Sequence, residues 1–165
     1  MAVIKPLWII TLLGAFAVNV LTYAHFPDTI SIYREEGGET AAFLARDAFF
    51  YTASGLILVI NIMFNLIGRW ATFLPEPLVF APKKAIWFQN PRTRKQLYRI
   101  LKEWVRGFAV LINIVLATII GLIYSANSTT GTFHLGWLLY MAAVVSVVWL
   151  AMYVVLLNDQ PEGAA

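Results

Sequence analysis

Four long apolar segments limit what this chain can fold into. They lie near residues 6–24, 47–68, 105–125 and 135–157, and a membrane-crossing helix needs roughly 20 mostly apolar residues. Backbone groups inside lipid must pair within their own segment, and the continuous apolar runs lack the alternation of barrel strands. We therefore predict an all-α integral membrane protein, one domain over 1–165, in which four transmembrane helices form a bundle.

Composition agrees with this prediction and excludes several function classes. Hydrophobic residues make up 60% of the chain and charged residues 13%, far from the values of about 45–50% and about 25% that are usual in soluble proteins. The sequence contains no cysteine, which excludes disulfides, CxxC zinc sites and thiol nucleophiles. It also contains no Gly-rich phosphate loop, HExxH or GxSxG motif. We expect no catalytic residue, no metal ligand and no cofactor.

The first apolar segment is expected to remain in the protein rather than to be cleaved as a signal peptide. Its apolar stretch is longer than the 7–15 residues that are usual in signal peptides. The residues at its end, Thr22, Tyr23 and Ala24, also match a small-x-small cleavage site poorly. We count this segment as the first transmembrane helix.

The distribution of lysine and arginine predicts the orientation in the membrane. Nine of the 12 lie between the second and third segments or at their flanks, and the loop before the last segment contains none. The loop between the first two segments is acidic. We predict an inner (plasma) membrane protein, and we orient it by the rule that Lys and Arg concentrate in cytoplasmic loops. Both termini and the basic segment 69–104 would be cytoplasmic, and the acidic loop would lie outside.

The basic segment contains a predicted amphipathic helix over 91–104. Asn90 is a suitable N-cap and Pro91 suits the first helical position, and apolar residues recur at spacings of three and four. The helix either continues into the third transmembrane helix or lies on the membrane surface. The preceding residues contain three prolines between Pro75 and Pro82, which favours extended structure packed at the interface.

Basic and aromatic residues of this segment are the predicted contacts with anionic lipid headgroups and with other membrane-protein subunits. These residues are Lys83, Lys84, Trp87, Arg92, Arg94, Lys95, Arg99 and Trp104. The alternative is a lid that folds back onto the protein's own helices. Interleaved basic and aromatic residues also occur in nucleic-acid-binding proteins, but beside a membrane helix they are ordinary interfacial residues. We expect no nucleic-acid partner.

Polar side chains inside the predicted helices are the second group of candidate residues. At about 100° per residue, those of the second helix, except Thr52, fall in a stripe about 40° wide. Similar depth in the membrane predicts hydrogen bonds between helices, with Asn61 facing Asn113. The full set is Asn19, Ser54, Asn61, Asn65 and Asn113. Helix packing is the simpler interpretation, and a polar path for a ligand or an ion is the alternative.

The stretch "YAHFPDTISIYREEGGETAAFLARDAFF" between the first two apolar segments resembles the domain of unknown function 1648 family, a prokaryotic membrane domain also found in SdpI-type immunity proteins. The similarity extends over about residues 25–105. The resemblance implies matching positions for Phe26, Pro27, Asp28, Ile30, Gly37, Gly38 and Arg46. Tyr33, Arg34 and Glu35 stand where the family has its His and Asn. The implied topology is a helix, an outer segment with a Gly turn, and a second helix.

Three functions remain open from the sequence. The first is a non-catalytic accessory or structural subunit of a larger membrane complex. The second is an immunity-like or sensor-like membrane protein that binds an extracytoplasmic partner through the acidic loop 25–46. The third is a small oligomeric transporter that uses the polar stripe. The lack of catalytic groups, the 24 aromatic residues and the long basic segment favour the first.

Overall fold

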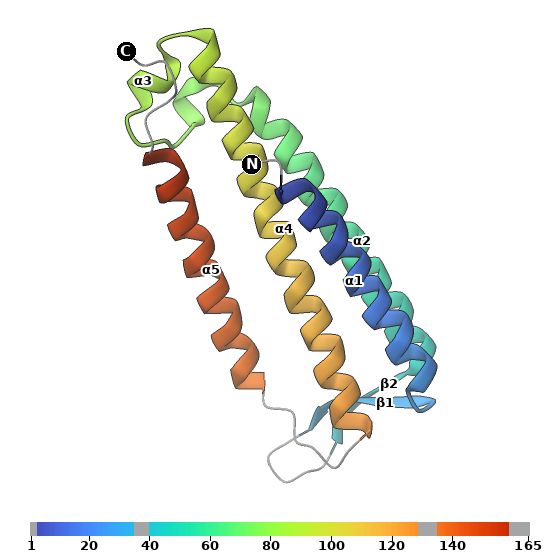
Figure 1. The fold of residues 1–165 in the computed structure, drawn as a ribbon. Coiled ribbons are helices and arrows are strands. Elements are labelled where there is room, and N and C mark those ends of the chain that lie inside the picture. The colour runs from blue at the N-terminus through green and yellow to red at the C-terminus, as the bar shows by residue number, and fades with distance from the viewer. Residues whose placement is uncertain (1–2, 35–39, 129–134, 159–165) are drawn as a thin grey trace.

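The structure is a computed structural model that describes residues 3–34, 40–128 and 135–158. Helices dominate it, and Figure 1 shows the long ones running side by side. Helix α1 (Ile4–His25), helix α2 (Arg46–Trp70) and helix α4 (Pro91–Ser128) pack against one another. Helix α5 (Leu135–Asn158) makes its main contacts with α4.

Three helices in the described residues are long and apolar enough to cross a membrane: Ile4–His25, Arg46–Phe73 and Pro91–Ser128. They correspond to the first three predicted segments. In α5 the described apolar stretch is shorter, from Tyr140 to Val155. The fourth crossing therefore stays a prediction.

Helix α4 joins the predicted amphipathic helix and the predicted third membrane helix into one helix of 38 residues. The side chain of Asn90 begins it, because Asn90 Oδ1 accepts hydrogen bonds from the backbone N–H groups of Arg92 and Thr93, both at 2.9 Å. These bonds satisfy donors that a helix start leaves unpaired. The basic first turns and the apolar later turns thus belong to one continuous helix.

A two-stranded antiparallel sheet lies between α1 and α2, where we predicted only a loop. It consists of β1 (Thr29–Arg34) and β2 (Thr40–Ala45). Ile30 is fully buried and joins an apolar cluster that includes Phe49, Ile57 and Ile120. The hairpin therefore covers one end of the three-helix bundle, as Figure 1 shows.

The opposite end is covered by the segment between α2 and α4. It forms the short helices η1 (Ala71–Phe73), η2 (Glu76–Leu78) and α3 (Lys84–Phe88), and its prolines prevent a longer helix. A buried apolar cluster joins this segment to α4 and α5, with the members Ala71, Val79, Trp87, Leu97, Ile100, Leu101 and Leu157. This arrangement matches the alternative of a lid folded back onto the helices, and we call residues 71–90 the lid.

Helix α5 is attached near this lid by aromatic side chains. The rings of Trp104 and Trp149 stack at 3.8 Å between centroids with an interplanar angle of 10°. Each indole N–H donates to the backbone carbonyl of the other residue, at 3.1 Å in both cases. Phe108 contacts Trp149, and the Tyr153 hydroxyl donates to the carbonyl of Phe80. In the described chain, α1, α2 and α4 form a three-helix bundle and α5 is attached to α4, so the four-helix bundle stays a prediction.

Candidate functional site

The polar residues inside the bundle meet at the junction of α1, α2 and α4. Asn61 Nδ2 donates to Asn113 Oδ1 at 2.7 Å, and Asn113 Nδ2 donates to Asn61 Oδ1 at 3.1 Å. The indole N–H of Trp8 also donates to Asn61 Oδ1, at 2.7 Å. Asn61 Nδ2 further donates to the carbonyl of Ile57 at 2.8 Å. The structure therefore brings Asn61 and Asn113 together in a closed network.

The hydrogen bonds of this network matter for stability because its amides are buried. The Asn113 side chain is fully buried and Asn61 is 4% exposed. Unpaired amides in such a position would each cost about 1–3 kcal/mol. Sequence reasoning missed the third member, Trp8, although a buried indole N–H usually finds an acceptor. Trp8 lies in an apolar segment long enough to cross a membrane. An indole N–H there needs an acceptor within the protein, and this signal could have identified it.

A second polar contact lies nearer the hairpin. Asn19 Nδ2 donates to Ser54 Oγ at 2.9 Å and to the carbonyl of Phe50 at 3.3 Å. This contact links α1 to α2. The two predicted residues therefore meet each other.

Asn65 does not join these contacts, which corrects our prediction for it. It is half-buried, and no hydrogen bond to it is found in the described part of the chain. Trp8 of α1 is level with Asn61, and the antiparallel helix α1 begins only one turn beyond, at Ile4. Asn65 therefore lies level with the beginning of α1, which offers it few hydrogen-bond partners.

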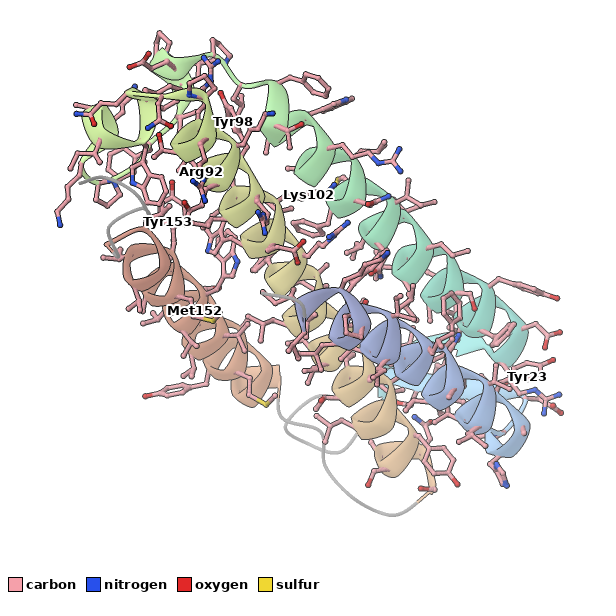
Figure 2. All side chains as sticks on the ribbon, turned by 45° about the horizontal axis from the view of Figure 1, so that its top comes forward. Tyr23, Arg92, Tyr98, Lys102, Met152 and Tyr153 are labelled. Carbon is pink, nitrogen blue, oxygen red and sulfur yellow. The ribbon has the colours of Figure 1, made fainter. Side chains whose placement is uncertain are left out.

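The basic residues gather at the lid end of the molecule. Lys83, Arg92, Arg94, Lys95 and Arg99 are exposed, and Lys84 is half-buried. Figure 2 shows Arg92 and Tyr98 near this end and Tyr23 near the opposite one. Arg106, further along α4, pairs with Glu103 at 2.6 Å. A strongly cationic surface therefore covers the lid and the first turns of α4.

Two aromatic residues that we predicted as partner contacts are not available on this surface. Trp87 is only 1% exposed and packs in the apolar cluster of the lid. Trp104 is half-buried and stacks on Trp149. Both side chains are used to attach the lid and α5 to α4. Their large apolar area gains more from this packing than a water-exposed position would allow.

The hairpin end carries the positions that the family resemblance implies. Phe26 is buried against Phe49 and Tyr124, with ring centroids at 5.4 and 5.5 Å. Arg46 pairs with Asp28 at 3.4 Å and donates to the carbonyl of Phe26 at 3.3 Å. These contacts tie the end of α1 to the start of α2. Gly37, Gly38 and Glu35 lie outside the described residues.

Asn127 fastens the hairpin to the end of α4. Its Oδ1 accepts from the Ser31 N–H at 2.8 Å, and its Nδ2 donates to the Ser31 carbonyl at 2.9 Å. The same Nδ2 donates to the carbonyl of Ile123 at 2.8 Å. The amide thus pairs with the edge of β1 as a neighbouring strand would.

An apolar cavity of about 220 Å³ lies beneath the hairpin, between α2 and α4. Its walls include Ile32, Leu44, Phe49, Leu56 and Ile120, and they expose only apolar atoms. Within residues 3–34, 40–128 and 135–158, no group of three or more His, Asp or Glu side chains could hold a metal ion. The described structure therefore offers polar networks for packing and charged groups at the two ends.

Comparisons with protein-family models, with curated proteins and with solved structures find no match to this chain. The resemblance described above stays a prediction. Function has to be inferred from the surfaces and contacts of the molecule.

Proposed function

We propose that this chain is a non-catalytic, multi-pass membrane protein that serves as an accessory or structural subunit of a larger membrane complex. In this proposal α5 is the fourth crossing and packs against a helix of a partner subunit. The cationic lid end lies in the cytoplasm, together with both termini, and contacts anionic lipid headgroups or acidic partner surfaces.

The observation that carries the proposal is that α5 packs mainly against α4 and leaves many of its large described side chains exposed. Among the described side chains of α5, Trp149, Tyr153 and Leu157 supply ring contacts and buried apolar contacts with the lid and α4. Large apolar side chains elsewhere on α5 are exposed, among them Val144, Val147 and Val155. Helices in membranes associate through close side-chain packing rather than through exclusion of water. A helix held near one end therefore leaves a long face for a partner.

The internal polar groups support packing rather than transport. Asn61, Asn113 and Trp8 satisfy one another, and Asn19 Nδ2 is bonded to Ser54, so that among these described side chains the buried Asn19 Oδ1 is left without a partner. Interhelical polar contacts of this kind commonly hold helices together. A transporter would need polar groups that face a water-filled path. This is why we favour a subunit over the small oligomeric transporter.

Photo-crosslinking in the native membrane tests the proposed role of α5. A photoreactive phenylalanine analogue at Val147 is expected to give one discrete adduct with another protein. The matched control is the same analogue at Ile62, which is similarly exposed on α2 and should contact lipid. Adducts only with further copies of this chain would favour the oligomeric transporter. Equal adducts, or none, from both positions would contradict the proposal.

We predict the orientation from the same proposal. Single cysteines can be introduced cleanly because the chain has none. A cysteine replacing Asp28, at the hairpin end, should react with a membrane-impermeant maleimide in intact cells. A cysteine replacing Lys95, at the lid end, should react only after the membrane is opened. The reverse pattern would overturn the assignment of sides.

A further inference from the structure

The two edges of the β1–β2 hairpin differ in what covers them. On the β1 side, the Asn127 amide pairs with both the N–H and the carbonyl of Ser31. These two Ser31 groups therefore point away from β2. We call the opposite side, which faces away from β1, the β2 edge.

The pairing register shows which groups point outward from the β2 edge. Facing residues in an antiparallel pair alternate between those that exchange hydrogen bonds and those that do not. Ser31 faces Phe43. Since the Ser31 groups point outward, the N–H and carbonyl of Phe43 also point outward, at the β2 edge. The Arg46 N–H donates to the Asp28 carbonyl at 2.9 Å, three positions further along, which fits this alternation.

Phe43 is thus the uncovered counterpart of Ser31. Among the described residues, no hydrogen bond from outside the β1–β2 ladder reaches its N–H or its carbonyl. Its ring is 63% exposed. A backbone donor, a backbone acceptor and an aromatic ring are therefore presented side by side.

The sequence of β2 lacks the charges and prolines that protect many natural strand edges, and the register shifts of the ladder begin only beyond the Ser31–Phe43 pair. Edge strands are commonly protected by lysine, by proline or by inward-pointing charges. Residues 40–45 read TAAFLA, with no charge and no proline. Such an edge is suited to strand addition, in which backbone hydrogen bonds supply affinity and side chains supply specificity.

Charge indicates the chemistry of the added strand. By sequence, residues 26–47 contain five acidic residues against two arginines, and one pair of these, Asp28 and Arg46, lies at 3.4 Å with the Asp28 side chain 93% exposed. A strand with basic residues would complement this end of the molecule. Antiparallel pairing of two copies about Phe43 would instead bring two acidic segments together, which is unfavourable.

We propose that the β2 edge binds an extended, basic segment of a partner protein by strand addition centred on Phe43. This site goes beyond the proposed function, which concerns α5 and the cationic lid at the other end of the molecule. It does not depend on either of those surfaces.

Titration of the detergent-solubilised protein with a short fluorescein-labelled peptide of alternating lysine and valine tests the proposal. We expect saturable binding by fluorescence anisotropy and slower exchange of the Phe43 amide hydrogen in the complex. Phe43→Pro removes the ring and an outward N–H, at a position where an edge strand tolerates proline. This variant should bind the peptide at least about tenfold more weakly, while the Leu44 amide, which faces β1, stays protected from exchange.

Two controls separate strand addition from simple charge attraction. The same peptide with N-methyl groups on alternate backbone nitrogens keeps its charge but loses its donors, and it should not bind. Phe43→Ala keeps the backbone groups of position 43, so the slower exchange of that amide in the complex should persist even where affinity falls. Absence of saturable binding, or equal binding by Phe43→Pro or by the methylated peptide, would overturn the proposal.

Discussion

Replacing Trp149 by alanine is expected to detach α5 from α4 and to lower the free energy of unfolding by about 3 kcal/mol, at the lower end for Trp→Ala changes. The substitution removes the stack on Trp104, the contact with Phe108 and the indole N–H that donates to the Trp104 carbonyl. Lipid can fill the space that the ring leaves, which keeps the cost at the lower end.

Spin-label distances and unfolding by added denaturing detergent measure this effect. Labels at cysteines replacing Lys95 on α4 and Val155 on α5, both exposed, should give a narrow distance distribution that broadens in Trp149→Ala. Trp70→Ala is the matched control, because Trp70 is 67% exposed and should change stability by no more than about 0.5 kcal/mol. An unchanged distribution in Trp149→Ala would contradict the attachment of α5 through this stack.

Replacing Asn61 by leucine should cost about 2 kcal/mol, since buried partners left unpaired cost about 1–3 kcal/mol. The change removes the acceptor of Trp8 and both bonds with Asn113. Asn113→Leu should cost about 1 kcal/mol, because Asn61 keeps its bonds with Trp8 and with the carbonyl of Ile57. The same detergent-induced unfolding measures both variants.

Asn65→Leu is the matched control for the polar network. It lies one turn further along α2 and has no hydrogen bond in the described residues, so its replacement should cost less than about 0.5 kcal/mol. The double variant Asn61→Leu/Asn113→Leu should cost less than the sum of the two single changes, because both remove the same pair of bonds. Equal costs for Asn61→Leu and Asn65→Leu would show that the network does not stabilise the bundle.

The sequence predicted those features that depend on long apolar runs and on depth in the membrane. Three of the four predicted segments correspond to helices that could span a membrane. Asn61 and Asn113 could be paired because their depth follows from the helix boundaries. Asn90 and Pro91 identified the start of α4 from local chemistry alone.

Features that depend on contacts between distant segments could not be predicted in the same way. An aromatic residue in a proline-rich segment has the same local signal whether it is buried or exposed, and Trp87 proved to be buried. The stack of Trp104 on Trp149 joins residues 45 positions apart. No periodicity within either helix reports that contact.

The sequence contains a pattern typical of a strand at the hairpin, which we did not use in the prediction. Thr29, Ile30, Ser31 and Ile32 alternate polar and apolar residues, as a half-buried strand does. Gly37 and Gly38 follow in the sequence, and glycines are a common turn signal between strands. We predicted instead an acidic outer loop over residues 25–46. The alternation was the better guide, because Ile30 is buried against the helices.

Mass spectrometry of the intact assembly, purified in mild detergent from the native membrane, tests the central claim most directly. An accessory subunit predicts a complex that contains at least one other polypeptide in constant ratio to this chain. It also predicts loss of that polypeptide when Val144 and Val147, on the exposed face of α5, are replaced by bulkier residues, while the variant chain itself stays folded. A single chain or a homo-oligomer, with its mass unchanged by the same substitutions, would contradict the claim.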